Sequence, residues 1–234
     1  MEAIIKKDLK VLFIDKFKET INNIPQKEVL NAWNHSPQKN WIDDRKNSMN
    51  NWSTKNWTPN NNQNWHNLKQ NWTTENNIWS KRYENVWNTF YFENILPKMQ
   101  NSFKIIDKSF QFWSESNFKI DGVFANNSEN GWNIPQIYVE SWNNNNTTEE
   151  EIFKLCCLNS PLKVFMTWSH DWNMERDNLA YNNWQNIVNA FSEKNMMNGE
   201  LLIIIAEWRN NTIHFTHFAY TNNGKRTKEQ TFNI

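Results

Sequence analysis

The stretch FKIDGVFANNSENGWNIPQIYVESW, residues 118–142, decides the fold. Alternating side chains predict two strands within it, at 118–124 and 136–142. A hairpin through the polar loop between them would place the two strands side by side. Asp121 would then lie in the middle of the first strand and Glu140 near the end of the second. Burying a carboxylate on a strand costs free energy unless the group binds a partner. We therefore expect Asp121 and Glu140 to bind something.

The residues on both sides of this stretch predict further helices and strands. Thr148, three residues before Glu151, has the capping-box pattern of a helix start, and that helix stops before Pro161. The other elements expected are helices at 2–24 and 80–100, a strand at 103–112, a strand at 162–168, a helix at 175–194 and a hairpin of 201–207 with 212–220. This order predicts an α/β fold with a central mixed sheet flanked by helices.

The first 79 residues differ from the rest in composition. After the helix at 2–24, residues 34–77 consist mainly of Asn, Trp, Ser, Thr, Lys and Gln, with too few aliphatic side chains for a core of their own. This segment is either a loosely ordered extension or a ladder of Trp side chains built for stacking on bases or sugars. We therefore expect a helical and Asn/Trp-rich N-terminal part at 1–79 and one α/β domain at 80–234.

Charge and hydropathy exclude several classes of function. The chain has 234 residues, with 25 basic and 25 acidic side chains, so its formal charge is zero. Broad electrostatic attraction to nucleic acid or to an anionic membrane is not encoded, and any nucleic-acid contact must be local. No run of about 18 apolar residues occurs. Lys6, Lys7 and Asp8 interrupt the apolar start, so we expect no signal peptide, no membrane partner and a cytoplasmic location.

Tryptophan is abundant and glycine scarce, with 15 Trp against 4 Gly. Average usage of about 7% would give roughly 16 glycines in a chain of this length. Many of the Trp residues follow Asn, as at Asn64-Trp65 and Asn183-Trp184, where Asn-Gly would be ordinary turn chemistry. Two interpretations stay open: some of these Trp codons are reassigned glycine codons in the source organism, or the tryptophans are genuine.

Asp121 and Glu140 are the candidate metal ligands. Two acidic oxygens that converge at a sheet edge are the usual way to hold Mg²⁺, because this ion keeps several waters and takes only one or two protein carboxylates. Such an ion, or Mn²⁺ in its place, can activate water and stabilise the charge that develops on a phosphodiester.

With acids on two neighbouring strands, the chain from about Ser80 to Trp168 resembles the PD-(D/E)XK, or restriction-endonuclease-like, nucleases. The core of that family is a helix, three strands, a helix and a strand, with Asp on the second strand and Glu-x-Lys on the third. Asp121 matches the first acid and Glu140 the second. The following EEEIFKLCCLNSPLKVFMTW also resembles the helix and strand after the motif in a bacterial branch. The resemblance implies a restriction-endonuclease-like core, a Mg²⁺-dependent hydrolase, and DNA as the partner.

Trp142 occupies the position at which the family has its motif lysine. Because strand side chains alternate, Glu140 and Trp142 share a face, so the geometry fits the family while the chemistry does not. In the family this lysine is thought to position the attacking water or to stabilise the charged transition state, and a lysine from a neighbouring helix can take its place. Lys154 is the available substitute. An ordinary surface ion pair with Glu150 or Glu151 is the alternative interpretation of Lys154.

Weaker candidates surround this set. Lys163, at the start of the next strand, is a second possible cation, and Glu84 and Glu93 on the preceding helix could add an acid, although each is more often a solvated helix residue. His170-Asp171 follows a strand end and could assist a site, or form a plain loop pair.

The sequence lacks the residue patterns that other kinds of catalytic or binding site require. The five histidines include no H-E-x-x-H pair, the sequence has no G-x-S-x-G elbow, and four glycines exclude a G-x-G-x-x-G fingerprint as the sequence is written. Cys156 and Cys157 are neighbours, so they provide neither a disulfide framework nor a thiolate cage, and we expect both to fill the core. Two functions remain: a metal-dependent nuclease with Asp121, Glu140 and Lys154 as site residues, or a catalytically degenerate member that keeps the fold as a binding or structural module.

Overall fold

The computed structural model of this chain describes residues 8–29, 90–114, 120–141, 148–169, 182–209 and 212–234. Two compact units are present, one formed by Met1–Gln26 with Tyr91–Ile234 and the other by Lys27–Phe90. The first unit contains the whole of the sheet. The Asn/Trp-rich segment 34–77, with its proposed Trp ladder, lies outside the described residues.

A seven-stranded mixed sheet forms the centre of the first unit, with its strands in sequence order from β1 to β7. Strands β3 and β4 are parallel, as are β4 and β5, and the other neighbours are antiparallel. The prediction of an α/β fold with a central mixed sheet is therefore confirmed. The strands are β1 (Phe110–Ser114), β2 (Gly122–Asn127), β3 (Asn133–Ser141), β4 (Leu162–Ser169), β5 (Glu200–Arg209), β6 (Thr212–Tyr220) and β7 (Gln230–Asn233).

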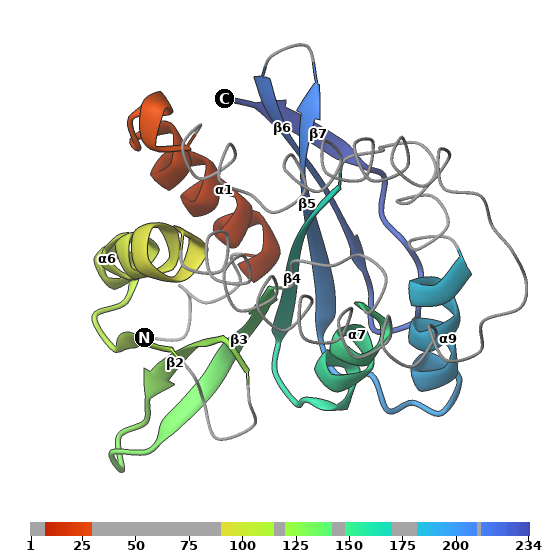
Figure 1. Cartoon of the computed structure of the whole chain (residues 1–234). Helices are drawn as coiled ribbons and strands as arrows, with labels where there is room; N and C mark the ends of the chain where they lie inside the picture. The colour runs from red at the N-terminus through yellow and green to blue at the C-terminus, as the bar shows by residue number, and fades with distance from the viewer. Residues whose placement is uncertain (1–7, 30–89, 115–119, 142–147, 170–181, 210–211) are drawn as a thin grey trace, which may run out of the picture. The chain divides into compact units, whose positions relative to one another are not determined.

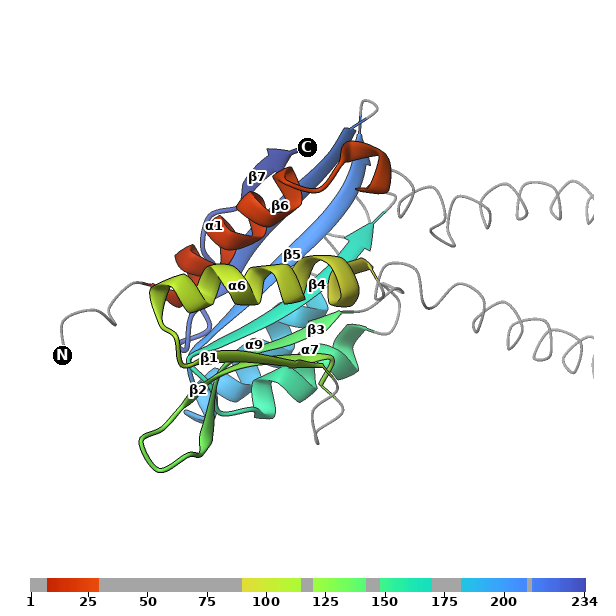
Figure 2. The same ribbon diagram turned by 90° about the vertical axis from the view of Figure 1, so that its left-hand side faces the viewer.

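Helices cover both faces of the sheet (Figures 1 and 2). Helices α1 (Leu9–Asn22) and α6 (Leu96–Ile106) lie on one face, and α7 (Thr148–Cys157) and α9 (Gln185–Glu193) on the other. Figure 2 shows α1 and α6 in front of the strands. None of the described helices is long and apolar enough to cross a membrane.

Helix α1 packs on the sheet through aromatic side chains. Its start is fixed by Asp8, whose carboxylate accepts the backbone N–H groups of Lys10 and Val11. Phe13 packs against Phe103 of α6 and Phe124 of β2, at 6.4 and 6.3 Å between ring centroids. The helix expected at 2–24 is thus present over its described part. It belongs to the unit with the sheet, because the apolar face of α1 is buried against that sheet.

The helix before the sheet ends later than predicted. A π-helical turn at Phe90–Ile95 leads into α6, which continues to Ile106, so Pro97 lies in the first helical turn and not near the end. Proline is well tolerated there, because the first N–H groups of a helix have no intrahelical partner. The strand predicted at 103–112 is wrong in its first part, where Phe103 is a fully buried residue of α6.

Strand β2 is shifted toward the C-terminus relative to its prediction. Asp121 immediately precedes the strand and does not lie in its middle, and Asn126 and Asn127 belong to the strand and not to the loop. Asn has a low strand propensity, but pairing overrides it: Asn126 pairs with Phe110 of β1 on one side and with Ile134 of β3 on the other.

The C-terminal half follows the sequence prediction closely. Strand β4 and the β5–β6 hairpin are confirmed, and α9 accounts for the described part of the helix expected at 175–194. Strand β7 was not predicted. It packs on the rest of the sheet through Phe232, whose ring stacks on Phe215 of β6 at 5.2 Å between centroids. Of the two cysteines, Cys156 is buried in the core as expected, whereas Cys157 is exposed.

Trp184 is an integral part of the core in this structure. It is 1% exposed, its indole N–H donates to the Thr148 hydroxyl at 3.0 Å, and its ring meets Phe165 edge-on at 5.6 Å between centroids. In the described part of the chain, positive φ angles occur only at Asn195 and three glycines, so no described Trp occupies a backbone position that calls for glycine. At position 184 the genuine-tryptophan interpretation is therefore favoured.

Candidate functional site

Asp121 and Glu140 lie opposite each other at the junction of β2 and β3. Gly122 pairs with Val139 in the antiparallel register, so Asp121, the residue before Gly122, lies opposite Glu140, the residue after Val139. The backbone N–H of Asp121 donates to Oε2 of Glu140 at 3.2 Å, and the backbone N–H of Ser141 donates to Oδ2 of Asp121 at 2.8 Å. The Ser141 hydroxyl also lies 3.3 Å from Oδ2. Each carboxylate is therefore held by the main chain of the segment that carries the other.

The two acids differ in burial. Glu140 is 3% exposed, while Asp121 is half-buried. Tyr138, two residues before Glu140, belongs to the core cluster that includes Ile152 and Leu155 of α7. Because side chains alternate along a strand, Glu140 faces the same side of the sheet as Tyr138, toward α7. The helix after β3 thus covers the Glu140 carboxylate.

Lys154 of α7 reaches Glu140. Its Nζ lies 2.6 Å from Oε1 of Glu140, and it also forms an ion pair with Glu151, one turn earlier on the same helix. The ion pair with Glu151 that was considered as an alternative for Lys154 is thus present, but Glu151 is buried, and Lys154 also contacts Glu140. The structure brings together Asp121, Glu140 and Lys154, the three residues that the sequence suggested for one site.

Glu151 is a fourth member of this cluster that the sequence analysis did not assign to the site. It is 9% exposed, and its carboxyl group raises the pKa of Glu140. A signal for its burial existed in the sequence. Glu151 immediately precedes Ile152 and lies four residues before Leu155, so it shares the apolar stripe of α7 instead of the solvent face.

The electrostatics of the cluster are dominated by burial. Burial raises the pKa of Glu140 above its ordinary value, and the neighbouring carboxyl groups of Glu151 and Asp121 raise it further, against the opposing effect of Lys154. Burial also raises the pKa of Asp121, while the backbone N–H of Ser141 works to lower it.

The Lys154 ammonium remains protonated at neutral pH. Burial acts to lower its pKa, but the hydrogen bonds to Glu140 and Glu151 outweigh this effect, and the pKa of Lys154 is raised. The cluster thus places three carboxyl groups around one ammonium, and the raised pKa of Glu140 favours the protonated form of that carboxyl group.

The ligand atoms of the cluster suit a small oxygen-seeking cation. Both hydrogen bonds from Ser141 reach Oδ2 of Asp121. Among the described residues, no group of three or more His, Cys, Asp or Glu side chains is arranged to hold a metal ion. Asp121 and Glu140 offer carboxylate oxygens, a type of ligand of which Mg²⁺ takes one or two because it commonly retains several waters.

Of the remaining sequence candidates, only Lys163 has a described side chain, and its hydrogen bond leads to another part of the fold. Lys163 is fully buried and its ammonium donates to the backbone carbonyl of Asn198, and burial lowers its pKa to about 8. Trp142, Glu84 and the pair His170-Asp171 lie outside the described residues, as does the side chain of Glu93.

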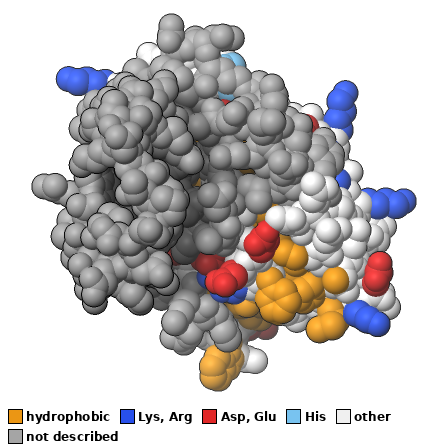
Figure 3. All heavy atoms as spheres, turned by 45° about the vertical axis from the view of Figure 1, so that its right-hand side comes forward, with side chains coloured by type: hydrophobic (Ala, Val, Ile, Leu, Met, Phe, Trp, Pro, Cys, Tyr) orange, Lys and Arg blue, Asp and Glu red, His pale blue; other side chains and the backbone are white. Residues whose placement is uncertain are grey.

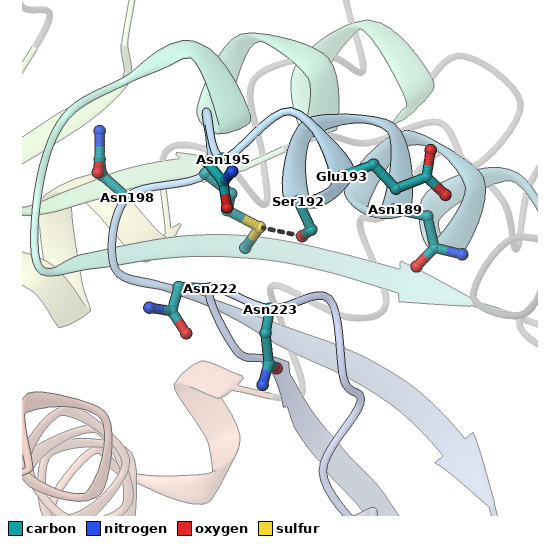
Figure 4. A pocket seen from close by; sticks show the side chains of 8 residues that line it. Asn189, Ser192, Glu193, Asn195, Asn198, Asn222 and Asn223 are labelled. Carbon is teal, nitrogen blue, oxygen red and sulfur yellow. Dashed lines mark hydrogen bonds between the residues drawn. The ribbon is translucent and has the colours of Figure 1, made fainter.

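A separate hollow of about 590 Å³ lies at the end of α9 (Figure 4). It is lined mainly by Asn side chains from α9, from the segment before β5 and from the β6–β7 connection, including Asn189, Asn198 and Asn222. Within it, the Ser192 hydroxyl contacts the Met197 sulfur at 3.8 Å. The hollow shares no residue with the acidic cluster.

The surface shown in Figure 3 carries acidic and basic side chains next to a hydrophobic patch. Exposed apolar residues of the unit include Phe153 of α7, whose ring contacts Phe191 of α9 edge-on at 5.2 Å between centroids.

Comparisons of the chain with protein-family models, with curated proteins and with solved structures found no match.

Proposed function

We propose that this chain is a metal-dependent nuclease that hydrolyses phosphodiester bonds of DNA, with a restriction-endonuclease-like core. In this proposal Asp121 and Glu140 hold Mg²⁺ or Mn²⁺, and Lys154 replaces the motif lysine. The observation that carries the proposal is the 2.6 Å contact between Lys154 Nζ and Glu140 Oε1. It brings an ammonium from the next helix to Glu140, which lies two residues before Trp142, the residue at the motif-lysine position of the sequence.

The order of elements around the acids supports the proposal. Helix α6 is followed by three antiparallel strands, then by α7, and then by β4, which pairs in parallel with β3. Asp121 directly precedes the second of these strands and Glu140 lies on the third. This is the order that the resemblance to the PD-(D/E)XK nucleases implies.

In the proposed mechanism the side chains of the cluster have separate tasks. Asp121 and Glu140 bind the ion, which when bound would activate water and stabilise charge on the phosphate. Ser141 fixes the direction of the Asp121 carboxylate through its backbone N–H. Lys154, protonated at neutral pH, would stabilise the negative charge that develops on the phosphate oxygens in the transition state.

The energetic cost of the cluster also favours a binding role. Buried carboxylates that repel one another destabilise a fold, and perturbed pKa values of this origin concentrate at functional sites. Glu140 and Asp121 both show them. A bound divalent cation would favour the ionised forms of both carboxyl groups.

The second candidate is a catalytically degenerate module that keeps the fold. One observation favours it: Glu140 already has a partner, because Lys154 binds both it and Glu151. An ion-pair network of this kind can hold α7 against β3 without any metal.

Metal calorimetry together with a cleavage assay separates the two candidates. Mg²⁺ and Mn²⁺ are titrated into the wild type, Glu140→Gln and the control Glu150→Gln, whose glutamate is exposed on the same helix. Plasmid and single-stranded DNA are tested as substrates with the same proteins. Binding and cleavage that are lost only in Glu140→Gln support the nuclease. Metal binding without cleavage favours the module, and a wild type that binds neither ion overturns the enzymatic proposal.

A further inference from the structure

The position of Lys154 has a consequence for how an ion could enter the site. Its side chain is 29% exposed, whereas the side chains of Glu140 and Glu151 are 4% and 12% exposed. Its ammonium contacts a Glu140 oxygen, so an ion that binds this carboxylate finds a positive charge already in place.

A metal ion and the ammonium compete for the same carboxylate. Mg²⁺ binds oxygen at about 2.0–2.1 Å, and Lys154 Nζ is 2.6 Å from Oε1 of Glu140. Two cations on one carboxylate repel each other strongly where water is scarce. Binding of the ion would weaken the contact between Lys154 and Glu140.

Glu151 offers the displaced ammonium another partner. It lies three residues before Lys154 on α7 and is already in contact with it. The backbone of α7 is anchored by buried Ile152, Leu155 and Cys156. The lysine side chain can therefore leave Glu140 and keep its contact with Glu151 while the helix backbone stays in place.

We infer that Lys154 is the resting counter-ion of Glu140, that a divalent cation must displace it, and that Glu151 is the positioning residue that receives it. This inference rests on the proposed function, since it assumes that Asp121 and Glu140 bind the ion. It adds a regulatory step: the ammonium leaves Glu140 for Glu151 only when the ion is bound.

Calorimetry with Mg²⁺ alone as the titrant tests the inference on the full chain. Lys154→Met removes the competing cation, and we expect it to bind Mg²⁺ at least ten-fold more tightly than the wild type. Glu151→Gln keeps the size of the side chain but removes its charge, and we expect weaker Mg²⁺ binding. The control Glu150→Gln should match the wild type.

A double-mutant cycle distinguishes a positioning role from a direct effect of Glu151 on the ion. If Glu151 acts by receiving Lys154, Glu151→Gln should change Mg²⁺ affinity much less in the Lys154→Met background than in the wild type. An undiminished effect would show that Glu151 acts on the ion itself and would overturn its assigned role.

Thermal unfolding gives a readout that needs no activity. Without metal, Lys154→Met leaves buried carboxylates without their positive partner, so its melting temperature should be lower than that of the wild type. Addition of Mg²⁺ should raise the melting temperature of Lys154→Met by more than it raises that of the wild type. If Lys154→Met does not fold, Glu151→Gln alone still tests the inference, because unchanged Mg²⁺ affinity in that variant overturns it.

The outcomes separate this inference from the proposed function. Unchanged or weaker Mg²⁺ binding in Lys154→Met, in a wild type that cleaves DNA, overturns the counter-ion role and leaves the nuclease. Tighter binding in Lys154→Met without cleavage by any form supports the counter-ion role and removes the nuclease. No binding by any form overturns both.

Discussion

The backbone N–H of Asp121 donates to the Glu140 carboxylate at 3.2 Å, so the two acids are joined through the main chain as well as through their charges. The reciprocal bond runs from the backbone N–H of Ser141 to Asp121 at 2.8 Å. A bond from the main chain survives substitution of the side chain on the donor residue. Variants of Asp121 should therefore leave Glu140 in place and report on the loss of one carboxylate alone.

Asp121→Asn should lose function and gain stability. The amide keeps the shape and can still accept the bond from Ser141, but it removes a charge that burial disfavours. We expect Mg²⁺ binding and cleavage to be lost, while the unfolding free energy of the metal-free protein rises by about 0.5–1 kcal/mol, as is common when a costly functional group is removed. Urea unfolding and calorimetry on the same preparation check this. A variant that is clearly less stable than the wild type would contradict the view that Asp121 is kept at an energetic cost.

Lys154→Ala should slow cleavage although the ion still binds. Loss of one group that stabilises transition-state charge reduces rates by about ten- to a thousand-fold. Single-turnover cleavage at saturating Mg²⁺ measures this step without the contribution of metal affinity. Lys16→Ala is the matched control, because Lys16 forms an i,i+3 ion pair with Glu19 on the exposed side of α1. Equal rates for Lys154→Ala and Lys16→Ala would limit Lys154 to a structural role.

The sheet could be predicted from the sequence because its inner strands have strong local patterns. The apolar run of β4 and the β5–β6 hairpin are examples, since β-branched and aromatic side chains dominate them. The ends of helices and strands were mispredicted where contacts with other elements outweigh the intrinsic secondary-structure propensity of the residues. Asn126 is in a strand only because both neighbouring strands pair with it, and Phe103 is helical because it packs on Phe13 and Phe124.

The candidate site was predictable in part for a similar reason. Asp121 and Glu140 are charges within apolar strand patterns, and such exceptions are visible in a sequence. That Lys154 contacts Glu140 depends on how α7 lies over β3, which no local pattern encodes. Glu151 stayed hidden because three consecutive glutamates at 149–151 look like a solvated helix start, although one of them is on the buried stripe.

Trp184 provides a test of the chain's unusual composition. Its buried ring and its bond to Thr148 predict that Trp184→Gly destabilises the protein by at least about 3–5 kcal/mol, the usual range for truncation of a large core aromatic residue. Trp184→Phe should cost less, since it retains most of the apolar volume and loses the hydrogen bond. Denaturant unfolding of both variants gives the values. If glycine is the native residue at this position, Trp184→Gly should instead be at least as stable as the tryptophan form.

His217 predicts how stability depends on pH. Its side chain is 4% exposed on β6, and burial, with a smaller contribution from Lys18, lowers its pKa to about 4. The folded state therefore prefers the neutral imidazole. The stability from this group is fully present above its unfolded pKa of about 6.5 and is lost as the pH falls from there toward 4. The free energy of unfolding can change by about 1.4 kcal/mol per pH unit in this range, because one proton is taken up on unfolding. Urea unfolding between pH 7.5 and 4.5 measures it, and His217→Leu, which cannot titrate, should show a flatter profile over that range. Equal slopes in the two proteins would mean that other groups set the acid sensitivity of the fold.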